Sequence, residues 1–163
     1  AETLAYAYHH LHRLDATVLR YFTVYGPAGR PDMSVFRFVR AIAEGEPITV
    51  TGDGRQERDF TFVDDVARGT VAALKPLGYE VINIGGDRPV VLADVIGIIE
   101  GALGKTATVQ YAPMPAADVL ATWADVRRAE KLLGWRPQVP IEEGVEQTVR
   151  WYMDNREWAK EIR

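Results

Sequence analysis

The segment ATVLRYFTV, residues 16–24, most constrains the fold of this chain. It is rich in β-branched, aromatic and aliphatic residues, and polar residues do not alternate with them. This pattern is typical of a strand that is buried on both faces of a parallel sheet. The sequence therefore predicts the α/β class, provided that helical segments alternate with strands along the rest of the chain.

Helical and strand patterns do alternate along the whole sequence, without repeats or a linker. The expected helices cover 2–13, a segment from Val35 that Gly45 closes, about ten residues opened by Asp64 and Asp65, 92–104, 124–135 and 140–158. The expected strands cover 16–24, 81–86 and 108–115, and residues 47–63 form a strand–turn–strand unit with GDG as its turn. We therefore expect one α/β or α+β domain over residues 1–163.

Composition excludes several classes of function. With 163 residues and 47% hydrophobic content, the chain is long enough for a substantial core. The 19 basic and 23 acidic residues give a net charge of −4, which argues against nucleic acid or an anionic membrane as the main partner. No apolar run approaches the ~18 residues of a membrane span, and no leader pattern is seen, so a cytoplasmic protein is expected.

The first candidate site follows the strand at 16–24, in the stretch RYFTVYGPAGRPDM at residues 20–33. In open α/β sheets, ligands bind beyond the carboxyl ends of the strands. The glycine- and proline-rich loop could present Thr23 and Arg30 to such a ligand. The alternative is an ordinary surface loop whose arginine is merely solvated.

The second candidate is GDGRQERDF at residues 52–60. Its glycine turn could let the backbone approach a ligand, and Arg58 could reach a phosphate group. Alternatively, Arg58 pairs with one of the nearby acids Asp53, Glu57 and Asp59, and GDG is simply a hairpin turn.

Two other motifs carry less information. The three histidines all lie in HHLH at residues 9–12, where the spacing i, i+3 could help to bind a metal. No carboxylate stands at ligand spacing within that helix, so we expect surface or interface histidines and no metal. The stretch GGDRP at residues 85–89 is not a GxGxxG motif and predicts a strand-to-loop turn near the ligand edge.

Four segments, taken in order, identify a family resemblance. They are RYFTVYGP, ITVTGDGRQERDFTFVDDVA, VINIGG and DVLATWADVRRAEKLLGWRPQVPIEEGV. Together they resemble the nucleotide-sugar epimerases and dehydratases of the extended short-chain dehydrogenase/reductase family. TVYGP followed by GRPDM is most similar to the UDP-glucuronate 4-epimerases. The resemblance implies the C-terminal substrate-binding lobe of such an enzyme plus the last parallel strands of its Rossmann sheet, with residues 1–26 and about 80–86 on the sheet side.

The resemblance also implies parts that this sequence does not contain. Family members carry a glycine fingerprint for NAD(P) and a Tyr-x-x-x-Lys pair, which would stand upstream of Ala1. In the family, hydride passes between C4 of the sugar and the nicotinamide, while the tyrosinate takes the 4-OH proton. We therefore expect no catalytic residue in this chain, an NAD cofactor held mainly by the absent N-terminal Rossmann half, and no epimerase activity from residues 1–163 alone.

The resemblance implies a role for each of six residues. Toward the nicotinamide and the sugar, Phe22 would pack by the nicotinamide and Thr23 would donate its hydroxyl to the substrate. Arg30 would bind a carboxylate or pyrophosphate. Toward the nucleotide, Phe36 would lie on the bordering helix, Arg58 would bind the diphosphate, and Asp118 would lie near the ribose and phosphate end. Some members carry arginine three residues before that acid, whereas this chain has Pro115. One phosphate ligand is therefore missing at that end.

Alternatives remain open at this point. The same lobe could come from a UDP-glucose 4-epimerase, a 4,6-dehydratase or a decarboxylase that acts on another nucleotide sugar. An alternative of a different class is a non-catalytic module that binds a nucleotide sugar or forms oligomers. In each case the expected small-molecule partner is a UDP-sugar or a related compound. The apolar stripe Leu4, Tyr8 and Leu11 predicts a homodimer or a larger assembly joined through residues 2–24.

Overall fold

The computed structural model describes residues 1–162 and confirms the predicted α/β class. Helices and strands alternate along the chain. Their order is α1 (Glu2–His12), β1 (Ala16–Tyr21), β2 (Thr23–Tyr25), α2 (Ser34–Glu44), β3 (Ile48–Thr51), β4 (Glu57–Phe62), α3 (Val63–Ala72), β5 (Tyr79–Ile84), β6 (Pro89–Val91), α4 (Leu92–Leu103), β7 (Val109–Ala112), α5 (Arg127–Leu133), α6 (Ile141–Asp154) and α7 (Arg156–Ala159).

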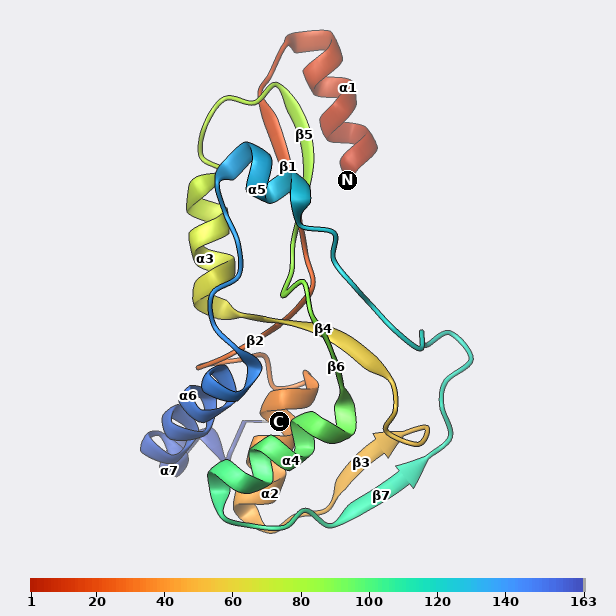
Figure 1. Ribbon diagram of the computed structural model, residues 1–163, viewed down its shortest axis with the longest axis vertical. Helices are drawn as coiled ribbons and strands as arrows, with labels where there is room; N and C mark the ends of the chain where they lie inside the picture. The colour runs from red at the N-terminus through yellow and green to blue at the C-terminus, as the bar shows by residue number, and fades with distance from the viewer. Residues whose placement is uncertain (163) are drawn as a thin grey trace.

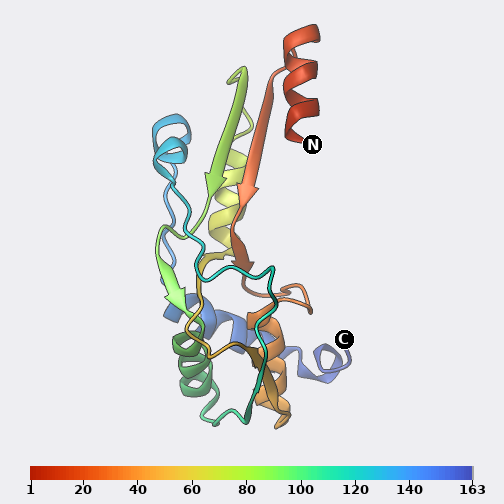
Figure 2. The same cartoon turned by 90° about the vertical axis from the view of Figure 1, so that its right-hand side faces the viewer.

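The strands form three small sheets in an elongated molecule (Figures 1 and 2). β1 pairs in parallel with β5, β4 lies between parallel β2 and antiparallel β6, and β3 pairs in parallel with β7. Figure 1 shows β1 and β5 at one end with α1, α3 and α5, while α2, α4, α6, β3 and β7 occupy the other end. The sheet β2–β4–β6 lies between these two groups.

The single strand predicted at 16–24 is wrong, because the chain changes sheet at Phe22. The backbone N–H of Phe22 still donates to the carbonyl of Ile84 in β5 (3.1 Å), but Thr23 already pairs with Phe60 in β4. The prediction that this segment is buried on both faces is also wrong within residues 1–162. The residues of β1 are half-buried or exposed, because β5 is the one strand that pairs with β1 in the described chain.

The two strands around GDG do not form a hairpin. The turn itself is present, with Gly52 and Gly54 at φ values of 70° and 81°. However, β3 leaves it to pair with β7, and β4 pairs with β2 and β6. A local pattern marks where a strand stops, but it does not identify the strand's partner, so the hairpin reading of residues 52–60 is corrected.

Most apolar burial lies in a cluster formed by α2, α4, α6 and β4. On α2 the predicted stripe is confirmed, since Val35, Phe36, Val39 and Ile42 are all at most 3% exposed. Gly45 ends α2 in the left-handed region at φ 74°, as the sequence predicted.

A second, smaller cluster packs α3 and α5 against β5. It is centred on Ile82, Ile84 and Trp135. None of the helices in residues 1–162 combines the length and the apolar character needed to cross a membrane.

Other expected elements differ in their bounds. The helix predicted at 124–135 begins only at Arg127, and the final helix breaks at Asn155 into α6 and α7. The short strand β6 was not predicted at all. Its three residues, PVV, give too short a pattern to be distinguished from a loop.

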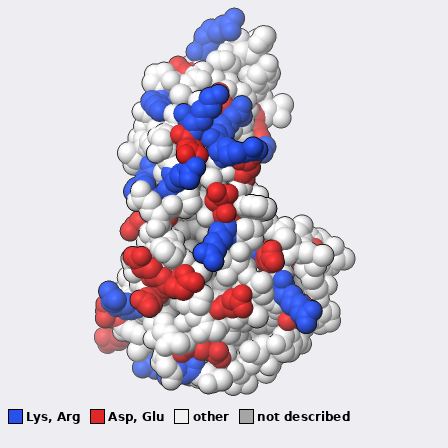
Figure 3. Space-filling model, in the orientation of Figure 1, with Lys and Arg blue, Asp and Glu red and all other residues white. Residues whose placement is uncertain are grey.

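Charged side chains separate over the visible face of the molecule. Figure 3 shows basic residues gathered over α5 and acidic residues over the beginning of α6. Part of the basic group is neutralised locally, since Arg127 pairs with Asp125 (2.5 Å) and Arg128 with Glu80 (3.4 Å). The basic patch over α5 is therefore partly compensated by neighbouring carboxylates.

Candidate functional site

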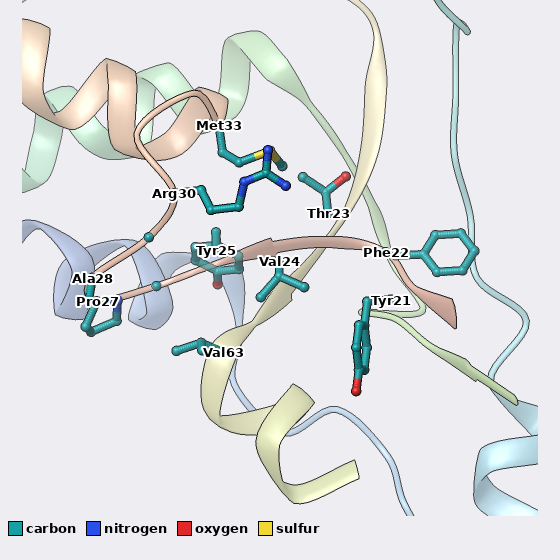
Figure 4. A pocket seen from close by; sticks show the side chains of 12 residues that line it. Tyr21, Phe22, Thr23, Val24, Tyr25, Pro27, Ala28, Arg30, Met33 and Val63 are labelled. Atoms are coloured by element: carbon teal, nitrogen blue, oxygen red, sulfur yellow. The ribbon is translucent and has the colours of Figure 1, made fainter. Parts of the chain in front are cut away.

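A cavity of about 570 Å³ lies where β2 runs into the glycine- and proline-rich loop. Three of the six predicted site residues line it, namely Phe22, Thr23 and Arg30. Figure 4 shows Arg30 reaching from the loop toward Thr23, with Met33 beside its guanidinium, while Phe22 points away at the far end of the strand. The loop at 26–33 thus turns an arginine back over the strand that it follows.

Arg30 is held by the neighbouring Asp32. Its Nε and Nη2 atoms donate to the two carboxylate oxygens of Asp32 at 3.1 and 2.5 Å, which is a bidentate pair. The hydrogen bonds from Arg30 hold the pKa of Asp32 below its usual range. Both side chains remain largely exposed, at 74% and 62%, so solvent screens the pair and a ligand can still approach the guanidinium.

The structure also brings Arg58 and Asp118 together. Nη2 of Arg58 donates to Oδ1 of Asp118 at 2.6 Å, and Nη1 donates to the backbone carbonyl of Glu57 at 2.8 Å. The two side chains are only 18% and 31% exposed, so the pair is partly shielded from water. The arginine therefore pairs with a distant aspartate, and its contact with adjacent Glu57 is to the backbone rather than to the carboxylate.

The cavity and the ion pair lie on adjoining strands. Thr23 of β2 is opposite Phe60 of β4, and Arg58 precedes Phe60 by two positions on that strand. Successive residues of a strand alternate between its faces, so Arg58 leaves β4 on the same face as Phe60. The parallel register thus fixes the distance along the sheet between the positions of Thr23 and Arg58.

Phe36 lies beneath the loop, where it lines a second small pocket with Thr23 and Arg30, whereas the histidines lie on α1. Phe36 is 3% exposed and packs in the core against Trp151 and Tyr152, with ring centroids 6.5 and 6.2 Å apart. On α1, Nδ1 of His9 lies 2.8 Å from the carbonyl oxygen of Leu14, beyond the end of the helix, and donates to it. Across residues 1–162 there is no group of three or more side chains arranged to hold a metal ion.

Sequence reasoning missed the central position of Asp59. This residue is 0% exposed, and its Oδ2 accepts a hydrogen bond from the backbone N–H of Ala124 at 2.7 Å. Its Oδ1 makes no hydrogen bond of good geometry. Burial raises the pKa of Asp59, while the N–H groups of Ala124 and residues 86–88 oppose that rise. The available signal was an acid inside the otherwise buried stretch DFTF.

The predicted turn at GGDRP is present and closes over Asp59. A Cβ on Gly86 would lie 2.3 Å from the carbonyl oxygen of Phe60 and 2.7 Å from Oδ1 of Asp59. A Cβ on Gly85 would lie 2.2 Å from the Cβ of Ala124. The two glycines are therefore needed because backbone and carboxylate approach them so closely.

Tyr25 is a second residue that the sequence did not single out. It is 4% exposed, its hydroxyl has no hydrogen-bond partner within the described residues, and burial raises its pKa strongly. The ring packs edge-on against Phe60 and Phe62, with centroids 6.1 and 5.7 Å apart. Tyr25 therefore forms the buried wall of the cavity rather than an ionisable group at its mouth.

Comparison with known proteins places the chain in a family. The sequence profile of the NAD dependent epimerase/dehydratase family matches residues 1–85. A UDP-glucuronate 4-epimerase from Thermodesulfobacterium geofontis is 56% identical over 164 residues, which cover 100% of this chain and 51% of that protein. The chain thus spans about half the length of the curated relatives that it matches.

Solved structures give the same result. The UDP-glucuronic acid 4-epimerase from Bacillus cereus, in complex with UDP-glucuronic acid and NAD, has a TM-score of 0.90 at 41% identity and matches 94% of this chain and 50% of its own. A UDP-glucose 4-epimerase from Thermotoga maritima with UDP-glucose has a TM-score of 0.89 at 32% identity, and the match covers 94% and 51% of the two chains. This chain therefore belongs to the NAD dependent epimerase/dehydratase family.

Proposed function

We propose that this chain is the UDP-sugar-binding half of an NAD-dependent nucleotide-sugar 4-epimerase that acts on UDP-glucuronate or UDP-galacturonate. The observation that carries the proposal is the cavity in which the Arg30 guanidinium reaches toward Thr23. A hydroxyl and a guanidinium on one wall suit a carboxylate, since both donate and the guanidinium adds positive charge.

The chemistry of a uronate explains why such a pair is needed. A 4-keto-6-carboxylate is a β-keto acid and tends to lose CO₂. Carbon dioxide leaves most easily when the breaking C–C bond lines up with the carbonyl π system. Thr23 and Arg30 would hold the carboxylate so that this bond stays out of line. Asp32, which binds Arg30 through two hydrogen bonds, limits the movement of the guanidinium.

Arg58 and Asp118 would serve the nucleotide end of the same substrate. The guanidinium of Arg58 would bind the diphosphate, and Asp118 would lie near the ribose and the phosphates. Pro115 stands where some family members carry a second arginine, so Arg58 would be the main cation at that end. Phe36 is buried in the core and stands on α2, the helix that would border the nucleotide.

The residues present fit one end of the NAD cofactor. Phe22 lines the cavity, and its ring packs close to Gly85, where a Cβ would lie 3.4 Å from the Phe22 Cγ. This aromatic wall would lie beside the nicotinamide, which, when bound, supplies the hydride acceptor. Neither the glycine fingerprint nor a Tyr-x-x-x-Lys pair occurs in the 163 residues, so these residues alone are expected to lack epimerase activity.

A second candidate within the enzyme class is the same lobe of a UDP-glucose 4-epimerase. It is favoured by the TM-score of 0.89 to the Thermotoga maritima enzyme, although identity falls to 32%. The 4,6-dehydratase and decarboxylase readings share the fold but are not favoured by a specific contact. A non-catalytic binding module would show nucleotide-sugar affinity without the preference for a carboxylate.

Association and location also belong to the proposal. The side chains of Leu4, Tyr8 and Leu11 on α1 are 63%, 51% and 71% exposed, which leaves an apolar stripe facing water. We expect these residues to join two copies of the chain or more. The cytoplasmic location stays a prediction from the sequence.

The deciding experiment is calorimetric titration of the chain with UDP-glucuronate, UDP-glucose and UDP. The proposal predicts that UDP-glucuronate binds more tightly than UDP-glucose, and that the difference disappears in Thr23→Val. Equal affinity for the two sugars in the unmodified chain would favour the UDP-glucose reading. Failure of all three ligands to bind would contradict the proposed function.

A further inference from the structure

Residues 118–124, here called the strap, run beside the first half of β4 without joining a regular helix or strand. A single bridge connects Glu57 with Ala121. The backbone N–H of Glu57 donates to the carbonyl of Leu120 at 2.8 Å, and the N–H of Thr122 donates to the carbonyl of Glu57 at 3.2 Å. The middle of the strap is thus held by backbone hydrogen bonds at one residue of β4.

Both ends of the strap are held through carboxylates. At its start, Asp118 accepts a hydrogen bond from Arg58 at 2.6 Å. At its end, the N–H of Ala124 donates to the carboxylate of Asp59 at 2.7 Å. The backbone N–H of Asp59 also donates to the Thr122 hydroxyl at 3.1 Å. Asp59 therefore contributes two of the contacts that keep the strap on β4.

Apolar packing holds the strap only at its end, where Ala124 is 0% exposed in the smaller apolar cluster. The large apolar side chains of the strap, Val119, Leu120 and Trp123, are 51%, 75% and 69% exposed. The part before Ala124 therefore buries little apolar surface and opens at a low free-energy cost unless polar contacts hold it. The contacts with β4 therefore decide where Asp118 lies.

We infer that Asp59 is a positioning residue for Arg58: by holding the strap at Ala124 and Thr122, it keeps the Asp118 carboxylate against the Arg58 guanidinium. The inference rests on the proposed function, in which Arg58 binds a diphosphate. With Nη2 on Asp118 and Nη1 on the Glu57 carbonyl, the guanidinium has one orientation before the ligand arrives. Preorganisation of this kind reduces the entropy that ligand binding would otherwise cost.

Asp59 is itself fixed well enough for this role. It is 0% exposed, and the loop containing Gly85 and Gly86 closes over it with no room for a Cβ at either glycine. A carboxylate accepts hydrogen bonds at both oxygens, whereas the side-chain amide introduced by Asp59→Asn must present its N–H groups on one side. In one orientation those N–H groups would face the Ala124 N–H and break the strap contact, and in the other they would face and repel the N–H groups of residues 86–88. We expect either orientation to loosen the strap.

The first test observes the Arg58 guanidinium of the unmodified chain by nuclear magnetic resonance, with Arg58→Lys to assign its signals. If both Nη groups are hydrogen-bonded, they rotate slowly and their protons give separate signals. We expect Asp59→Asn to average these signals, and Thr122→Val, which removes only the hydroxyl contact, to keep them. Thermal unfolding checks that each variant is folded. Unchanged Arg58 signals in folded Asp59→Asn would overturn the inference.

A second measurement needs no variant and covers the case in which Asp59→Asn does not fold. The N–H of Val119 donates to Oδ1 of Asp118 at 2.9 Å and so reports on the start of the strap. If Asp59 holds the strap as one unit, the amide protons of Val119, Thr122 and Ala124 exchange with the same opening free energy. Much faster exchange at Val119 than at Ala124 would show that the Asp118 end moves independently, and the inference would fail.

The link to ligand binding is measured by a double-mutant cycle with UDP-glucose. Asp59→Asn should weaken binding by about tenfold in the presence of Arg58 and should have no further effect in Arg58→Ala. Equal weakening in both backgrounds would indicate a general structural role and overturn the inference. If UDP-glucose, UDP-glucuronate and UDP all fail to bind the unmodified chain, the proposed function fails, while the two strap measurements still decide the inference.

Discussion

Nη2 of Arg58 donates a hydrogen bond of 2.6 Å to Oδ1 of Asp118, a residue 60 positions further along the chain. The pair joins β4 to the segment between β7 and α5, and both side chains are mostly shielded from solvent. A phosphate group offers the same kind of anionic oxygen as the aspartate. A diphosphate that binds Arg58 would therefore have to share its guanidinium with Asp118 or displace that carboxylate.

The first prediction concerns Arg58→Ala. A hydrogen bond to a charged group contributes roughly 1.5–3 kcal/mol, so affinity for UDP and for every UDP-sugar should fall by about 10- to 150-fold. Calorimetric titration with UDP measures this. The matched control is Arg55→Ala, because the Arg55 side chain is 87% exposed and pairs only loosely with Asp53 at 3.6 Å. Equal UDP affinity in Arg58→Ala and the unmodified chain would refute the phosphate assignment.

Thr23→Val should act at the sugar end alone. It removes the hydroxyl but keeps the shape, so UDP-glucuronate should bind about tenfold more weakly while UDP binds as before. Thr23→Ser keeps a hydroxyl and is expected to retain most of the affinity. A parallel loss of UDP affinity in Thr23→Val would mean that the side chain supports the loop rather than the uronate.

Tyr25→Phe should leave the free energy of unfolding unchanged or raise it. The Tyr25 hydroxyl is buried without a partner in the described part of the chain, and an unsatisfied buried polar group costs about 1–3 kcal/mol. Denaturant titration checks this expectation. A clear loss of stability in Tyr25→Phe would show that the hydroxyl has a partner in solution.

Gly144→Ala should destabilise the same region by about 1–3 kcal/mol through overpacking. The added Cβ would lie 2.1 Å from the Tyr25 hydroxyl oxygen and 2.9 Å from Cδ2 of Phe62. Alanine is favoured over glycine in a helix by only about 1 kcal/mol, so the steric term should win. Gly101→Ala in α4, where a Cβ meets nothing within 4 Å, is the control that should stabilise. We expect the denaturant midpoint of Gly144→Ala to lie below that of the unmodified chain and the midpoint of Gly101→Ala to lie above it.

Glu44 should make stability depend on acid pH. The hydrogen bonds from Arg156 and Tyr152 lower the pKa of Glu44 from 4.5 to about 2, despite partial burial. Because the folded-state pKa lies below the unfolded one, the stabilisation is complete above pH 4.5 and is lost as the pH falls through about 2. The midpoint temperature of thermal unfolding should therefore be lower for Glu44→Gln than for the unmodified chain, and the difference should be largest at neutral pH. If the two midpoint temperatures differ by the same amount at neutral pH and at a pH of about 2, the assignment is contradicted.

The local elements were predictable because each carries its own signal. The apolar stripe of α2 with Gly45 after it, and the acids that open α3, fix those helices within one or two residues. The partners of the strands were not predictable in this way. Nothing local in residues 16–24 marks Phe22 as the point where the chain leaves β5 for β4, because the segment is apolar on both sides of it.

The same distinction between local and long-range contacts applies to the candidate site. The loop pattern and the resemblance both pointed to Thr23 and Arg30, and the two residues line one cavity because the loop between them is short. The pairing of Arg58 with Asp118 and the burial of Asp59 depend on the position of a distant segment. A sequence pattern of a few residues carries no information about such a contact.

The parallel pairing of β3 with β7 has a consequence for the order in which the chain can be completed during synthesis. Ile48 can pair only after Val109 has been synthesised, and Arg58 can pair only after Asp118 has been synthesised. Contacts so distant in sequence close slowly, because a long flexible loop must be ordered first. On the ribosome, β2 can pair with β4 early, whereas the anion-binding end stays unfinished until the segment after β7 has emerged. Because α6, which completes the main apolar cluster, emerges later still, all residues of the ligand site are available on a nascent chain before that core can close.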